Sequence, residues 1–183
     1  MTTYKEQTMS KSIAVLVTDA FEDSEYWKPV DTLRAAGYAI FNIEKEKNNV
    51  VKGKTDQTPV TIDLGIGEAK VDDYAALLIP GGHSPDALRG DDRFAQFVKD
   101  FDATGRPIFT ICHGPQLLIS AEVVQGRKMT AVKNIAIDLK NAGAQFEDSA
   151  VVIDDNRLVT SRTPQDLPQF NEAILKVLKA RDA

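Results

Sequence analysis

The single cysteine of this chain, Cys112, has a type and a setting that could support nucleophilic chemistry. Residues 107–111 form a short, largely apolar run that is typical of a buried parallel strand. Gly114 and Pro115 then indicate a sharp bend into a helix, with Gly114 supplying conformational freedom and Pro115 suiting the first helical position. A thiol at such a corner faces unpaired helix N–H groups and the positive end of the helix dipole, which favour the reactive thiolate. We therefore predict that Cys112 is a nucleophile.

An isolated cysteine is more often an inert buried side chain than a catalyst. The adjacent His113 and the glycine–proline corner favour catalysis here, because a core cysteine needs neither. His83 and His113 are the two histidines of the chain, and each follows a predicted strand. His113 is the stronger candidate, since its imidazole could stabilise a thiolate or carry protons at neutral pH. One cysteine and one histidine are too few ligands for a metal site, and we expect no metal or cofactor.

Carboxylates near the start of the first predicted helix have two interpretations. Glu22, Asp23 and Glu25 could simply interact favourably with the helix dipole. Glu22 or Glu25 could instead point toward Cys112 and share a proton with it, because both can face the same edge of the helix. Asp86 could likewise open a short helix or orient a histidine.

Gly81 and Gly82 follow another predicted strand and present backbone N–H groups that no side chain covers. Such a turn suits an anion or an oxyanion, although a tight strand-to-helix turn is the simpler interpretation. Its predicted place beside Cys112 favours the functional interpretation. The chain has no glycine-rich nucleotide-binding motif after its first strand, so the sequence gives no support for nucleotide binding.

Strand-like and helix-like segments alternate along the chain, which predicts a single α/β domain with a mostly parallel sheet and helices on both faces. In such a sheet, sites lie beyond the carboxyl ends of the strands, where residues 19–25, 81–86 and 112–114 all fall. The first ten residues are polar, and we expect a disordered extension at 1–10 before a domain at 11–183. We predict strands at 13–18, 38–43, 75–79, 107–111 and 129–132, short antiparallel strands at 50–51 and 60–62, a hairpin at 151–153 and 158–161, and helices ending at Ala36, over 91–103, after Pro115, over 135–142 and over 167–178.

The composition of the chain argues against some classes of binding partner. The chain has 183 residues, a net charge of −5 and a pI of about 5.1. The acidic balance gives no basic stripe for stable binding to nucleic acid or to an anionic membrane. A single cysteine excludes an internal disulfide framework and suits the reducing cytosol, so we expect a cytoplasmic protein. No apolar run reaches the ~20 residues of a membrane span.

Together these segments resemble the PfpI family, within the class I glutamine amidotransferase-like superfamily. The resemblance covers the chain from about Lys11 to the closing helix, and the cysteine segment is its most specific part. The matching segments are 21–25 (Phe-Glu-Asp-Ser-Glu), 80–86 (Pro-Gly-Gly-His-Ser-Pro-Asp), 111–121 (Ile-Cys-His-Gly-Pro-Gln-Leu-Leu-Ile-Ser-Ala), 126–128 (Gly-Arg-Lys), 141–144 (Asn-Ala-Gly-Ala) and 159–164 (Val-Thr-Ser-Arg-Thr-Pro).

The resemblance implies a flavodoxin-like three-layer sandwich with a small β-hairpin. It also implies a strained nucleophile at Cys112, with His113 as its catalytic partner. Glu25, or its neighbour Glu22, would be the carboxylate that contacts the cysteine. The oxyanion and substrate-binding positions would be Gly81, Gly82, His83 and Gly114, which lie at the two strand ends. The N–H groups of Gly82 and His113 would be the oxyanion donors.

One position departs from the family pattern. In relatives a glutamate completes a catalytic triad across a subunit interface, and here the shorter Asp86 occupies that place. If Asp86 acts in the same way, the active protein must be a homodimer or a larger homo-oligomer.

Three functions are consistent with these residues. The leading hypothesis is a stress-protective deglycase or glyoxalase in which the Cys112 thiolate attacks methylglyoxal or its adducts on proteins, amines and thiols. The second is an intracellular cysteine peptidase that needs His113 to protonate an amine leaving group. The third is a redox-sensing chaperone in which oxidation of Cys112 changes partner binding.

Overall fold

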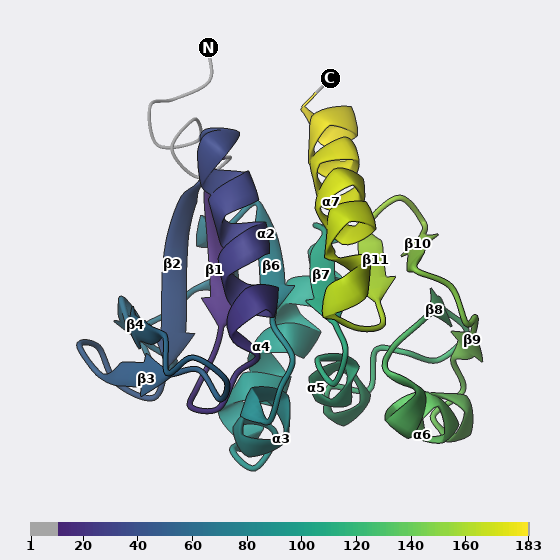
Figure 1. The fold of residues 1–183 in the computed structure, drawn as a ribbon, viewed down its shortest axis with the longest axis horizontal. Helices are drawn as coiled ribbons and strands as arrows, with labels where there is room; N and C mark the ends of the chain where they lie inside the picture. The colour runs from purple at the N-terminus through teal and green to yellow at the C-terminus, as the bar shows by residue number, and fades with distance from the viewer. Residues whose placement is uncertain (1–10, 183) are drawn as a thin grey trace.

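The computed structural model of the protein describes residues 11–182, and the extension predicted at 1–10 lies outside them. A seven-stranded sheet occupies the centre, in the order β10-β11-β7-β6-β1-β2-β5 (Figure 1). Every neighbouring pair is parallel except β10 and β11, which form the predicted hairpin. The strands are β1 Ser12–Leu16, β2 Ala39–Glu44, β5 Leu64–Gly65, β6 Ala76–Ile79, β7 Ile108–Ile111, β10 Val151–Asp154 and β11 Leu158–Ser161.

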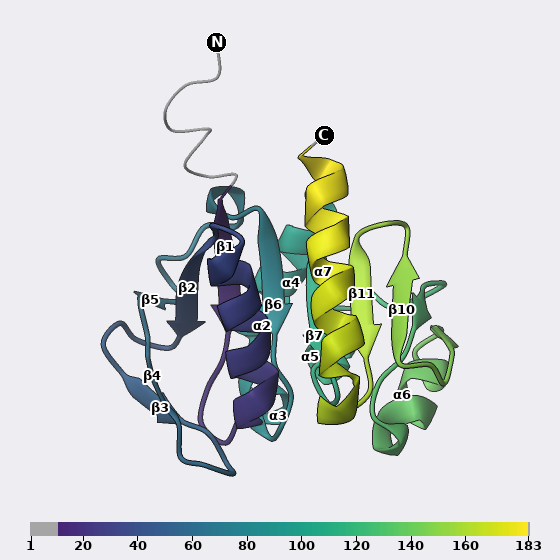
Figure 2. The ribbon, with the colours of Figure 1, turned by 45° about the horizontal axis from the view of Figure 1, so that its top comes forward.

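Helices cover both faces of this sheet, which confirms the predicted flavodoxin-like α/β architecture. One face carries α2 and α7, which lie side by side (Figure 2). The other face carries α4 and α5, with the short α3 and α6 near the lower end of the sheet in Figure 1. The helices are α2 Asp23–Ala35, α3 Ser84–Leu88, α4 Asp92–Ala103, α5 Pro115–Ser120, α6 Ala136–Asn141 and α7 Leu167–Arg181, with 3₁₀ turns η1 Val71–Asp73, η2 Lys133–Ile135 and η3 Pro164–Asp166.

Each face of the sheet packs its own apolar core because successive strand residues point to opposite faces. In β1, Ala14 and Leu16 pack with the α4 side, and Ile13 and Val15 pack with the α2 and α7 side. All five residues of this strand are buried, as expected for a central strand covered on both faces. The apolar side of α4 is buried, at Phe94, Phe97, Val98 and Phe101.

One strand prediction needs correction. The strand expected at 129–132 is only β8 (Lys128–Met129), and it pairs with β9 (Gln145–Phe146) away from the central sheet. Pro29 lies inside α2, which starts at Asp23 and continues through the proline. The antiparallel pair near residues 50–62 is confirmed as β3 (Val50–Lys52) with β4 (Pro59–Thr61).

No helix of the described residues 11–182 is long and apolar enough to cross a membrane.

The assignment of residues to the core predicts which substitutions lower the stability of the fold. Phe101 is fully buried, whereas Ile137 keeps 59% of its surface exposed. Phe101→Ala should lower the free energy of unfolding by about 3–5 kcal/mol because it removes buried area and leaves a cavity. Ile137→Ala should change it by less than about 0.5 kcal/mol. Urea unfolding followed by circular dichroism measures both values, and equal effects would contradict the core assignment.

Candidate active site

The backbone at Cys112 takes an unusual conformation directly after β7. Its φ angle is +61°, in the left-handed region that a non-glycine residue rarely adopts. Two hydrogen bonds hold it there: the Cys112 N–H donates to the Ser161 carbonyl at 3.0 Å, and the Val132 N–H donates to the Cys112 carbonyl at 3.2 Å. The surrounding structure therefore imposes the bend on the cysteine, which is a known feature of functional sites.

Gly114 has a different role from the one its sequence position indicates. Its φ of −51° is ordinary helical geometry, so the bend does not need glycine for conformational freedom. It needs glycine for space, because an added Cβ would collide with Thr110 Oγ1 and lie 2.8 Å from the Ile79 carbonyl oxygen. Pro115 stands at the start of α5, as predicted.

The turn after β6 interlocks with the turn after β1. The Glu22 N–H donates to the Gly81 carbonyl at 3.2 Å, and the His83 N–H donates to the Ala20 carbonyl at 2.8 Å. Gly82 has a φ of +80°, and a Cβ there would lie 2.6 Å from the Ala20 oxygen. These contacts place the first turn of α2 against the turn that follows β6.

Glu25, in this first turn of α2, is the carboxylate that reaches the cysteine. Its side chain is fully buried, and its Oε1 accepts a hydrogen bond from the Gly81 N–H at 3.1 Å. The Cys112 thiol interacts with this carboxyl, whose Oε2 is buried and has no other polar partner among the described residues. Glu22, the alternative, instead pairs with Lys54 at 3.3 Å. The structure therefore resolves which of the two acids lies at Cys112.

The buried thiol and carboxyl affect each other's ionisation. Burial and the Glu22 charge raise the pKa of Glu25 to about 8. Burial and the Glu25 charge raise the pKa of the Cys112 thiol to about 12, although N–H groups of His113 and Gly82 act against this. The prediction that the corner alone favours thiolate is therefore wrong. Because ionisation of either group opposes ionisation of the other, the pair titrates as a unit and keeps a proton near neutral pH.

His113 contacts the thiol within one chain. Its Nδ1 lies 3.4 Å from Cys112 Sγ, although adjacent side chains often point apart. Burial, Lys54 and His83 lower the pKa of His113, and the Asp86 carboxylate opposes them. His113 is therefore a neutral imidazole near pH 7, which can accept a proton from the thiol.

Asp86 and His83 are both exposed near this imidazole. Among the hydrogen bonds and ion pairs of the described residues, none joins Asp86 to His113, so one chain does not complete a cysteine–histidine–aspartate triad. The role predicted for Asp86 stays a prediction.

Two of the predicted oxyanion or substrate positions are already occupied. The Gly81 N–H donates to Glu25, and the Gly114 N–H donates to the Ile111 carbonyl at 2.9 Å. Those two glycines therefore shape the site without offering free donors. The N–H groups of Gly82 and His113 are directed at the Cys112 sulfur, where they can stabilise negative charge.

Lys54, on the loop between β3 and β4, is a site residue that sequence reasoning missed. Its charge lowers the pKa of Cys112, of Glu25 and of His113. A lysine in a polar hairpin carries no local signal that it approaches a strand end far along the chain. Only the fold brings it there.

Asp23 anchors the Lys54 loop to α2. Its carboxylate is buried and accepts hydrogen bonds from the Thr55 N–H at 2.9 Å and the Thr58 N–H at 3.1 Å. Burial opposes ionisation, but these hydrogen bonds outweigh it and lower the pKa of Asp23 to about 2. Asp23 therefore has a structural role beyond the helix dipole.

Within residues 11–182, no group of three or more histidine, cysteine or acidic side chains is arranged to hold a metal ion.

Comparison with known proteins assigns the family. The family model described as "DJ-1/PfpI family" matches residues 11–177, and the chain belongs to this family. It is 59% identical over 172 residues to "Protein/nucleic acid deglycase 2" of Escherichia coli (strain K12), covering 94% of this chain and 100% of the relative. It is 51% identical over 171 residues to "General stress protein 18" of Bacillus subtilis (strain 168), covering 93% and 99%.

Two further comparisons bear on function and fold. The chain is 49% identical over 171 residues to a Bacillus subtilis (strain 168) protein named "Putative cysteine protease YraA", covering 93% of this chain and 100% of that protein. A solved two-domain protein of Anabaena variabilis, with DJ-1/ThiJ/PfpI-like and ferritin-like domains, matches with a TM-score of 0.89 and 36% identity. That match covers 92% of this chain and 50% of the other.

The Lys54 charge yields a prediction about thiol reactivity. Lys54→Met should raise the pKa of the Cys112 thiol and slow its alkylation by iodoacetamide at pH 8 by about two- to fivefold, as expected for one partly screened charge. The difference should shrink in 1 M salt. Lys54→Arg is the matched control. Faster alkylation of Lys54→Met, or equal slowing by Lys54→Arg, would contradict this role.

The Asp23 anchor predicts a pH dependence of stability. Its folded pKa of about 2 lies below the ordinary value of 3.8, so its stabilisation is present above pH 4 and is lost as the pH falls toward 2. At pH 7, Asp23→Asn should be less stable by about 2 kcal/mol, and this gap should close at low pH. Urea unfolding across this range tests the prediction, and a gap independent of pH would refute it.

Proposed function

We propose that this protein is a cysteine-dependent enzyme that converts reactive carbonyls, methylglyoxal and its adducts, to lactate. The observation that carries the proposal is the fully buried Glu25 carboxyl that interacts with the Cys112 thiol. An acid with a pKa of about 8 can both donate and accept protons near neutral pH. The rearrangement of an α-oxoaldehyde to a hydroxy acid requires such a group, because a proton must leave one carbon and return to the next.

The first step forms a carbon–sulfur bond. His113 Nδ1 accepts the thiol proton as Cys112 Sγ attacks the aldehyde carbon, and the carbonyl electron pair moves to oxygen. The N–H groups of Gly82 and His113 stabilise this oxygen, and Glu25 protonates it to give a hemithioacetal.

The second step moves a hydrogen between neighbouring carbons. The Glu25 carboxylate removes the proton from the former aldehyde carbon while the His113 imidazolium protonates the ketone oxygen, which gives an enediol. Glu25 then returns its proton to the adjacent carbon, and His113 takes the proton from the hydroxyl on the former aldehyde carbon. The product is a lactoyl thioester of Cys112. Water then cleaves the carbon–sulfur bond, which releases lactate and restores the thiol. An amine or thiol adduct follows the same route once the sulfur has displaced the amine or thiol.

The relatives support this direction. One relative is named a protein and nucleic acid deglycase and another a general stress protein, so a stress-protective role against carbonyl damage is part of the proposal. The substrate would be the free aldehyde or a modified macromolecule. A modified nucleic acid would bind only transiently as a substrate, because the net charge of −5 gives no basis for stable binding to its phosphates.

A cysteine peptidase is the second candidate, and one relative carries such a name. Amide cleavage needs His113 to become an imidazolium that protonates the leaving amine. Its lowered pKa, and the lack of a hydrogen bond to Asp86 among the described residues, make that role less favourable within one chain. A partner subunit that supplies Asp86 would change this balance, and we propose a homodimer or larger homo-oligomer on that basis. The cytoplasmic location and the redox-sensing chaperone role stay hypotheses.

The proposal predicts which variants lose lactate production. Cys112→Ala should abolish turnover of methylglyoxal, and Glu25→Gln should lower kcat by at least about a hundredfold because the proton carrier is removed. Glu172→Gln, an exposed acid on α7, is the matched control and should retain full activity. Lactate formation by purified protein is the measurement, with circular dichroism to verify folding.

Turnover that survives in Cys112→Ala would overturn the proposal. Cys112-dependent cleavage of small amide substrates without lactate formation would establish the peptidase instead.

A further inference from the structure

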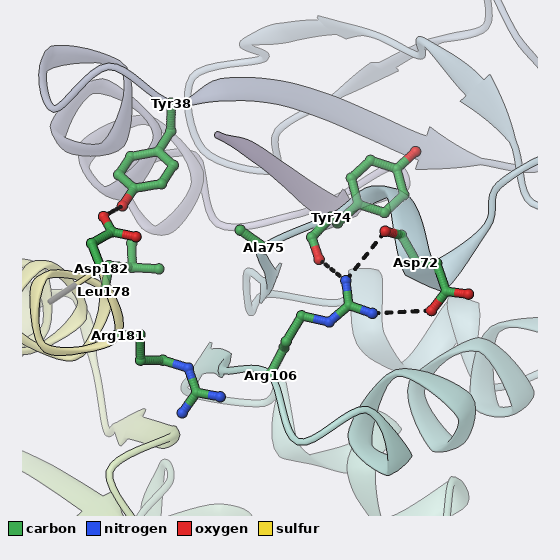
Figure 3. A pocket seen from close by; sticks show the side chains of 8 residues that line it. All are labelled: Tyr38, Asp72, Tyr74, Ala75, Arg106, Leu178, Arg181 and Asp182. Carbon is green, nitrogen blue, oxygen red and sulfur yellow. Dashed lines mark hydrogen bonds and ion pairs between the residues drawn. The ribbon is translucent and has the colours of Figure 1, made fainter. Parts of the chain in front are cut away.

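A second cavity lies at the end of the sheet opposite to Cys112. Its lining comes from residues just before three parallel strands and from the last turn of α7 (Figure 3). Tyr38 precedes β2, Ala75 precedes β6, and Arg106 precedes β7. Cys112 follows β7, at the carboxyl ends of the strands. The cavity is therefore separate from the candidate active site.

The walls of this cavity are mainly apolar and aromatic. Figure 3 shows Tyr38, Leu178 and Arg181 on one side, Tyr74 and Arg106 on the other, and Ala75 between them. Its volume is about 200 Å³. That volume is below the usual range for drug-sized ligands and suits a single ring.

Most charges on this cavity are already compensated. The Arg106 guanidinium pairs with Asp72 at 3.1 Å and donates to carbonyl oxygens, including that of Tyr74. Asp182 accepts a hydrogen bond from the Tyr38 hydroxyl at 3.1 Å and pairs with Lys11 at 3.7 Å. Each of these charges therefore has a partner of opposite charge at the opening.

Arg181 is different. Its Nη2 donates to the Gly105 carbonyl at 2.8 Å, and this is the contact that holds the guanidinium at the cavity. Arg181 is exposed at the rim of the cavity, and no carboxylate of residues 11–182 forms an ion pair with it, so its planar guanidinium is available to a carboxylate.

We infer that this cavity is a binding site for a small monocarboxylate with an aromatic or compact apolar body. The ring would lie against Tyr38, Leu178 and Ala75, and the carboxylate would pair with Arg181. A neutral ligand of the same shape would leave Arg181 unpaired, so the charge provides the selectivity. An adjoining cavity of about 260 Å³ shares Tyr38, Leu178 and Asp182, and it gives room for a substituent on the ring.

Calorimetric titration of the full-length protein with benzoate tests the site, and benzamide is the uncharged probe of equal shape. Saturable binding of benzoate at millimolar concentrations is expected, with benzamide about three- to fivefold weaker. Arg181→Gln should weaken benzoate by about the same factor, because it removes the charged partner of an exposed ion pair. Ala75→Leu should abolish binding by filling the cavity. Lys176→Gln removes a cation from an exposed position of α7 outside the cavity, and it should bind as the unmodified protein does.

Three results would overturn the inference: no saturable binding of benzoate, equal affinity for benzamide, or unchanged benzoate affinity in a folded Arg181→Gln or Ala75→Leu variant. Thermal unfolding of each variant separates loss of binding from loss of fold, and Ala75→Leu keeps the test valid if Arg181→Gln is unstable. Because the cavity and Cys112 lie at opposite ends of the sheet, Cys112→Ala should bind benzoate normally.

Discussion

The burial of the Glu25 carboxyl against the Cys112 thiol is the constraint on which the rest of the site depends. Two adjacent buried acids cannot both ionise without a large electrostatic free-energy cost, so the pair must keep a proton. That proton is what the proposed chemistry moves. The Gly81 N–H and the Lys54 charge reduce the cost, and neutral His113 receives the proton that the thiol gives up.

The fold supplies this arrangement by interlocking three strand ends. The turns after β1 and β6 are joined by backbone hydrogen bonds, which bring the first turn of α2 to the thiol. The end of β11 and the segment after β8 fix Cys112 with a φ of +61°. Gly82 and Gly114 are required because side chains there would collide with these neighbouring segments. The strained backbone of Cys112 and the close packing around Gly82 and Gly114 therefore both lie at the carboxyl ends of the strands, where they position the candidate site.

Much of the fold could be predicted from the sequence, because buried parallel strands and amphipathic helices such as α4 leave clear hydrophobic patterns. The bend at Cys112 after a buried strand, with Pro115 starting the next helix, could also be predicted from the sequence. The contribution of Lys54 and the choice of Glu25 over Glu22 could not, since both depend on contacts between distant segments. The pKa of Cys112 was misjudged for a related reason: the helix dipole is a local feature, whereas burial and the Glu25 charge are tertiary effects.

The most direct test of this account is the pKa of Glu25 itself. Carbon-13 NMR of protein labelled at the glutamate carboxyl carbons, followed through a pH titration, would resolve it, with Glu25→Gln to assign the signal. The account predicts that Glu25 titrates near pH 8, far above the ordinary value of 4.5. A Glu25 carboxyl that titrates at the ordinary value would contradict it, because the carboxyl would then be ionised at neutral pH and could not protonate the hemithioacetal oxygen.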